Sequence, residues 1–131
     1  MSYVGLSPTE HLPVLLYVRG YTDYDVIEEA IRLSGFTITE VVSGTAKGVD
    51  SLGEDYAESR GLPVKKFPAD RDHLGKGAGY RRNEQMAEYA DQLIAIWDGK
   101  SRGTKHMIDI AGDKHLLIFT HCPYLESLYG F

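Results

Sequence analysis

The sequence predicts an α/β protein, a single Rossmann-like domain with an open parallel sheet of about five strands and helices on both faces. Three observations lead to this prediction. Short apolar runs recur along the chain, segments with helical periodicity separate them, and 131 residues with 43% apolar side chains suffice for one hydrophobic core. Strands that alternate with helices are joined by right-handed crossovers, which produce a parallel sheet.

The expected strands are apolar runs of the kind found in buried parallel strands. In chain order they cover residues 14–18, 41–43, 64–67, 93–97 and 116–119. Pro63 and Pro68 bound the third of these runs. Because proline cannot donate a backbone hydrogen bond, this strand is expected to be short.

The expected helices place apolar side chains on one face. They cover residues 24–33, 49–60, 81–90 and 104–111. The first has Ile27, Ala30 and Ile31 at helical spacing, and the third has Asn83 on its apolar stripe. A buried amide requires a hydrogen-bond partner, so Asn83 is expected to contact either a polar group or a ligand.

The chain is expected to form one domain over residues 1–131. Its core covers residues 14–119, with an N-terminal arm at 1–13 and a C-terminal tail at 120–131. The tail carries Leu125, Leu128, Tyr129 and Phe131. These side chains would cover an edge of the core or make a homo-oligomer contact.

Composition excludes several classes of partner. No stretch approaches the roughly 20 apolar residues of a membrane-spanning helix, and residues 1–10 lack the features of a signal peptide, so we expect a cytoplasmic protein with no membrane partner. A net charge of −5 makes a nucleic-acid partner an unfavoured interpretation. The five histidines show no metal-ligand spacing, and neither a metal nor a cofactor is expected.

The loop after the second expected strand is rich in small residues and opens a helix. Small residues allow an anion to approach the backbone, and the N–H groups at a helix start attract it. The candidate ligand-binding residues here are Ser43, Gly44, Thr45, Lys47, Gly48 and Asp50. The alternative is that the glycines only make a tight turn between strand and helix.

A similar loop follows the fourth expected strand. Its candidate ligand-binding residues are Asp98, Gly99, Ser101, Gly103 and Thr104. One glycine-bracketed turn is weak evidence, whereas two at helix starts in one small sheet favour phosphate binding.

Arg81, Arg82 and Asn83 are further candidate ligand-binding residues, at the start of the third expected helix. Cations there oppose the helix dipole, by about 0.3–1 kcal/mol each, and an anion should offset them. A ligand phosphate would do so, and so would Glu84 or Asp70 from within the chain.

Arg19 and Tyr21 are candidates in the loop after the first expected strand. Tyr21 would stack on a base or a ribose, or else lie half-buried at the rim of the site.

Taken in this order, the motifs resemble the YspA-like family of the SLOG superfamily, which includes the LOG phosphoribohydrolases and DNA-processing protein A. The resemblance covers residues 14–119 and is carried by segments 19–24, 43–50, 61–64, 67–70, 79–83 with Met86, and 97–104. It implies a Rossmann-like fold and a role in binding, sensing or processing nucleotides and nucleotide-derived small molecules.

The same resemblance ranks the functions. The hydrolytic LOG relatives carry a GGxGTxxE string whose Glu is the catalytic carboxylate, and Met107 occupies that position here. Because methionine can neither stabilise developing positive charge nor activate water, the favoured function is binding of a phosphorylated nucleotide-like molecule, for sensing, carrying or sequestration. The alternative is a nucleoside 5′-monophosphate N-glycosidase, with Asp98 or Asp50 as the candidate catalytic carboxylate.

Overall fold

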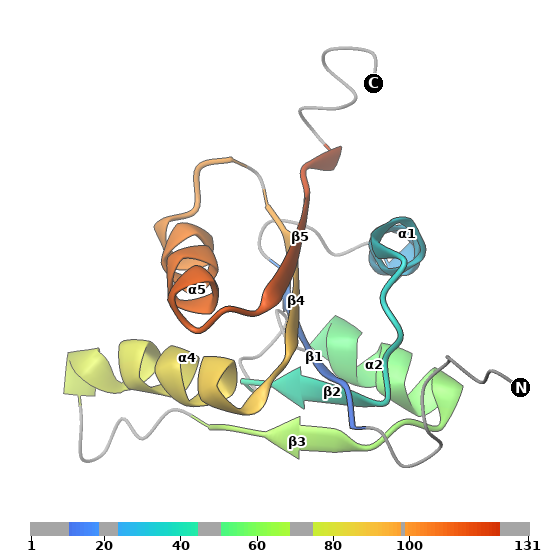
Figure 1. The fold of residues 1–131 in the computed structure, drawn as a ribbon, viewed down its shortest axis with the longest axis horizontal. Coiled ribbons are helices and arrows are strands. Elements are labelled where there is room, and N and C mark those ends of the chain that lie inside the picture. Colours follow the sequence, from blue (N-terminus) through green and yellow to red (C-terminus); the bar gives the residue numbers. More distant parts are fainter. Residues whose placement is uncertain (1–10, 19–23, 45–50, 69–74, 98, 124–131) are drawn as a thin grey trace, which may run out of the picture.

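The computed structural model describes residues 11–18, 24–44, 51–68, 75–97 and 99–123, and it confirms the α/β fold class (Figure 1). All five strands in this part of the chain are parallel and form one sheet in the order β3-β2-β1-β4-β5. The strands are β1 (Pro13–Val18), β2 (Glu40–Ser43), β3 (Val64–Lys66), β4 (Gln92–Ile96) and β5 (Leu117–His121). The helices are α1 (Tyr24–Ser34), α2 (Ser51–Arg60), α4 (Ala78–Tyr89) and α5 (Arg102–Asp113), with a 3₁₀ turn η1 (Gly75–Gly77) before α4.

The helices cover the sheet in two layers. Helices α1 and α2 pack on one face, and α4 and α5 pack on the other (Figure 1). Side chains alternate between these faces along each strand, so Leu16 packs toward α1 and α2 while Leu15 packs toward α4 and α5. Among the described helices there is no candidate for a membrane-spanning segment.

Burial separates the central strands from the edge strands. Every residue of β1 and β4 is buried, as the sequence predicts. The expectation that residues 116–119 form a buried strand is wrong, because Leu117 is 63% exposed and Ile118 is 37% exposed. Strand β5 lies at one edge of the sheet, so it has a neighbouring strand on only one side.

Helix α4 begins at Ala78, three residues before the expected start at Arg81. The sequence 77–79 is typical of a loop because it contains two glycines. A glycine costs a helix only about 1 kcal/mol relative to alanine, and burial of Ala78 against the rest of the domain stabilises the extra turn.

The sheet order defines where a ligand is expected. From β1 the chain proceeds through β2 to β3 on one side and then returns to β4 and β5 on the other. In open parallel sheets ligands bind beyond the carboxyl ends of the strands near such a reversal. The ends of β2 and β4 lie about 10 Å apart, because β1 separates them and neighbouring strands are about 4.8 Å apart.

A cluster of polar side chains lies at the opposite end of the sheet, at the amino ends of the strands. The Tyr89 hydroxyl donates to Oε1 of Glu40 at 2.5 Å, and Nε2 of His11 lies 2.5 Å from the same oxygen. The hydrogen bond to Glu40, with burial and the carboxylate charge, raises the pKa of Tyr89 to about 12. Tyr89 therefore stabilises the fold while its hydroxyl is protonated.

The Tyr89 bond predicts a loss of stability at high pH. A folded-state pKa above the unfolded value of 10.0 adds stability below about pH 10, and this stability is lost as pH rises toward 12. We expect Tyr89→Phe to be less stable than the wild type at about pH 9, with a difference that shrinks by about pH 12. Urea unfolding across this range measures it, with Tyr80→Phe as the control. A difference that stays constant with pH would contradict the assignment.

Candidate functional site

Arg82 is a buried cation at the carboxyl end of β2. Its side chain is 8% exposed and reaches from α4 to Gly44, whose carbonyl accepts a hydrogen bond from Nη1 at 2.9 Å. Buried guanidinium groups are normally paired with a carboxylate, because removing a charge from water is costly. No carboxylate in the described ranges lies within ion-pair distance of Arg82. The charge is therefore uncompensated by the described part of the chain.

Asn83 shares this environment. It is 5% exposed, and its Oδ1 accepts a hydrogen bond from Nε of Arg82 at 3.2 Å, which confirms the prediction that its amide lies buried with a polar partner. Among residues 11–18, 24–44, 51–68, 75–97 and 99–123, none accepts from Nη2 of Arg82 or Nδ2 of Asn83. Within the described part of the chain, these two donor groups have no acceptor.

Gly44 has a steric role that the sequence does not reveal. A Cβ at this position would lie 2.8 Å from Nη1 and 3.0 Å from Cδ of Arg82. Such distances are shorter than carbon contacts allow, so a side chain at Gly44 would displace the guanidinium. The absence of a side chain at Gly44, which is expected to let an anion approach the backbone, also makes room for the side chain of Arg82.

The N-terminus of α4 carries no acidic residue and no side-chain cap. Gly77 occupies the N-cap position, and no carboxylate lies in the first turn. Its leading N–H groups therefore keep their partial positive charge, and Arg81 adds an exposed cation to the same turn. The first turn of α4 therefore favours an anion, whereas Glu84 and Glu88 lie exposed further along the helix.

Glu54 is a carboxylate at this edge that the sequence analysis missed. It lies in the first turn of α2, half-buried, and its Oε2 accepts a hydrogen bond from the Ser43 hydroxyl at 2.5 Å. Ser43 and Gly44 are consecutive residues on opposite faces of the strand end, so Glu54 and Arg82 flank the end of β2. Glu54 could have been identified in the sequence as an acidic residue one helical turn after the loop of small residues at 43–50.

The loop after β4 uses its hydroxyl groups internally. Ser101 is the N-cap of α5, and its Oγ accepts from the backbone N–H of Thr104 at 3.3 Å and from the Thr104 hydroxyl at 3.1 Å. The indole N–H of Trp97 donates to the Ser101 carbonyl at 3.1 Å, and Gly99 adopts the left-handed φ of 83° that closes the turn. Thr104 is fully buried, so its side chain acts in the cap. Ligand contact from this loop would come from backbone N–H groups near Gly103.

Seven of the predicted site residues lie outside the described residues. They are Arg19, Tyr21, Thr45, Lys47, Gly48, Asp50 and Asp98. Their roles stay predictions. Of the others, the structure brings Gly44, Arg82 and Asn83 into contact, places Ser43 beside them and leaves Arg81 exposed on α4. Separately from these, Gly99 and Ser101 lie in the turn after β4, and Gly103 and Thr104 lie in the first turn of α5.

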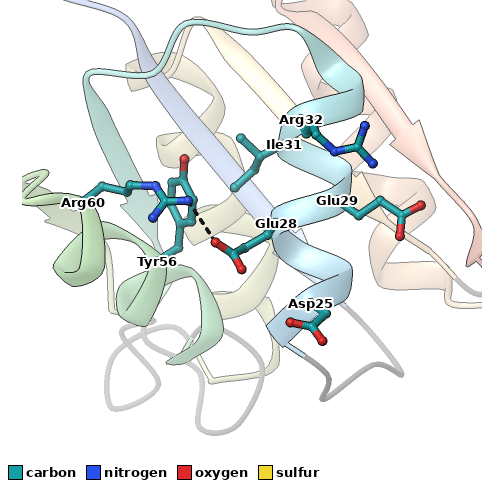
Figure 2. Close-up of a pocket in the computed structure, with 7 residues that line it drawn as sticks. All are labelled: Asp25, Glu28, Glu29, Ile31, Arg32, Tyr56 and Arg60. Carbon is teal, nitrogen blue, oxygen red and sulfur yellow. Dashed lines mark hydrogen bonds and ion pairs between the residues drawn. The ribbon is translucent and has the colours of Figure 1, made fainter.

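A groove of about 540 Å³ lies elsewhere, between α1 and α2 (Figure 2). It is lined by Asp25, Glu28, Glu29, Ile31, Arg32, Tyr56 and Arg60. Arg60 donates to Glu28 at 2.9 Å and lies over the Tyr56 ring, and its pKa is raised by the Tyr56 hydroxyl and by Glu28. The groove is lined by both acidic and basic side chains, and Arg60 and Glu28 form an ion pair across it. Its chemistry therefore favours no single class of ligand.

Comparisons with known proteins identify no family for this chain. No family model matches it, and no curated protein matches it. One similar solved structure is the predicted subunit of a tRNA methyltransferase from Methanocaldococcus jannaschii, with 14% identity and a TM-score of 0.49, covering 83% of this chain and 67% of that one. The Rossmann-like fold therefore stands on the sheet order and parallel register of the chain itself.

Proposed function

We propose that this protein binds a phosphorylated, nucleotide-like small molecule at the carboxyl edge of its sheet. The observation that carries the proposal is the buried guanidinium of Arg82, which has no carboxylate partner in the described part of the chain. A phosphate would supply the missing negative charge and accept hydrogen bonds from Nη2 of Arg82 and Nδ2 of Asn83. Bound in this way, the ligand would be sensed, carried or sequestered.

The separation between the carboxyl ends of β2 and β4 favours an extended ligand. The ends of β2 and β4 are about 10 Å apart, and the first-turn N–H groups of α5 lie beyond β4. A lone inorganic phosphate would occupy only one of these positions, whereas a nucleoside phosphate spans both. The motifs that resemble the YspA-like family of the SLOG superfamily support the same class of ligand.

The hydrolase alternative lacks a carboxylate at the position of Met107. This side chain is fully buried in the core cluster that includes Leu93 and Ala95, so it does not face a ligand. N-glycosidase activity would require a carboxylate from elsewhere, and Asp50 and Asp98 lie outside the described residues. Cleavage of the glycosidic bond therefore remains the second candidate.

A panel of phosphates tests both candidates together. Purified protein is incubated with inorganic phosphate and with nucleoside mono-, di- and triphosphates, cyclic nucleotides and ADP-ribose, and thermal shift and release of free base are followed. We expect a ligand at 100 times its Kd to stabilise the native state by about 2.7 kcal/mol without product. Release of free base would establish the hydrolase, and no shift with any phosphate would contradict binding.

A further inference from the structure

We infer that Glu54 recognises the ribose hydroxyl groups of the ligand, so that the site prefers ribose phosphates over deoxyribose phosphates. This inference rests on the proposed phosphate site at Arg82 and adds the sugar class. Its basis is the position of a carboxylate and a guanidinium on the two sides of one strand end.

The geometry fixes Glu54 at this strand end. The Ser43 hydroxyl, on a residue only 2% exposed, donates to Oε2 at 2.5 Å and holds the carboxylate toward β2. A carboxylate accepts about four hydrogen bonds through its two oxygens, so the bond from Ser43 leaves capacity for further donors. Half-burial of Glu54 leaves part of this capacity accessible.

The opposite charges of Glu54 and Arg82 suit them to bind different parts of the ligand. A carboxylate in the first turn of α2 repels a phosphate there, which places the phosphate on the Arg82 side of the strand end. Glu54 instead requires neutral donors, and vicinal hydroxyl groups are neutral donors with a spacing that suits one carboxylate. In dinucleotide-binding sheets an acidic residue likewise accepts from a ribose hydroxyl.

Loss of one hydroxyl should weaken binding. Deoxyribose leaves a Glu54 oxygen without the donor that ribose supplies, and sites that bond a substrate hydroxyl discriminate strongly against analogues that lack it. We expect the wild type to bind ribose 5-phosphate at least tenfold more tightly than 2-deoxyribose 5-phosphate. These two probes carry no base, so the comparison isolates the sugar.

The experiment is a calorimetric titration with ribose 5-phosphate, 2-deoxyribose 5-phosphate and inorganic phosphate. In Glu54→Gln the ratio of the affinities for ribose 5-phosphate and 2-deoxyribose 5-phosphate should fall from tenfold to below about twofold, because the amide replaces one acceptor by a donor. The affinity of this variant for inorganic phosphate should stay within about twofold of the wild-type value. Ser43→Ala should lower the ratio through loss of positioning. Glu58→Gln, an exposed glutamate on the same helix, is the matched control and should keep the wild-type ratio.

The possible results distinguish ribose recognition by Glu54 from phosphate binding at Arg82. Equal affinity of the wild type for the two sugar phosphates would overturn the ribose inference and leave the phosphate site standing. A ratio unchanged in Glu54→Gln would also overturn it. Binding of none of the three probes would overturn the phosphate site itself, and the ribose inference with it. The wild-type comparison decides the matter even where a variant fails to fold.

Discussion

Replacement of Arg82 by methionine is expected to abolish phosphate-dependent stabilisation while leaving the protein folded. Methionine is neutral and fills a similar volume, so it removes the charge and the donors that would bind phosphate. Hydrogen bonds to a charged group contribute about 1.5–3 kcal/mol, which corresponds to at least a tenfold loss of affinity for ribose 5-phosphate.

The stability of Arg82→Met without ligand provides a second readout. Breaking a buried ion pair costs about 3–5 kcal/mol, because the remaining partner keeps an uncompensated charge. Since no carboxylate in the described ranges pairs with Arg82, we expect a loss below about 2 kcal/mol, mainly from the unpaired Gly44 carbonyl. Arg32→Met, at an exposed arginine on α1, is the control and should keep wild-type affinity. A loss above about 3 kcal/mol would mean that Arg82 already has an anionic partner in the chain.

Gly44→Ala is expected to weaken phosphate binding by up to the loss seen in Arg82→Met, although alanine adds only one methyl group. Its Cβ would lie 2.8 Å from Nη1 of Arg82, which forces the guanidinium away from the end of β2. Because the atoms met belong to a flexible side chain, the guanidinium can shift with little loss of stability, and we expect about a tenfold loss of affinity for ribose 5-phosphate.

Two controls show whether Gly44 acts through Arg82. Gly112→Ala places a methyl group in open space on α5 and should not change binding. The double variant Gly44→Ala/Arg82→Met should bind no more weakly than Arg82→Met alone, because residues that act through one contact are not additive. Additive losses in the titration would show that Gly44 contributes by another route.

The sequence predicts the fold well because its signals are local. Apolar runs locate the five strands that the structure describes, and helical periodicity locates α1, α2, α4 and α5, with errors of a few residues at their ends. The errors have physical causes. Residues 77–79 resemble a loop, yet burial of Ala78 extends α4, and the apolar composition of residues 116–119 does not reveal that β5 is an edge strand.

The candidate site is harder to predict because it depends on contacts across the fold. Arg82 and Asn83 are identified from an unfavourable charge at a helix start and from a polar residue on an apolar stripe, both of which are local signals. The contact of Arg82 with Gly44 joins residues 38 positions apart, and the bond from Ser43 to Glu54 depends on how α2 packs on β2. Neither contact follows from spacing along the chain.

Binding of the ligand phosphate by the guanidinium of Arg82 can be followed at the arginine itself by NMR. The Nε–Hε cross peak of Arg82, assigned by its absence from Arg82→Met, is followed in ¹⁵N-labelled protein during titration with ribose 5-phosphate. We predict a saturable shift of this peak with the same Kd that calorimetry gives. A peak that stays in place while calorimetry shows saturation would contradict binding by Arg82, because the phosphate would then bind elsewhere on the protein.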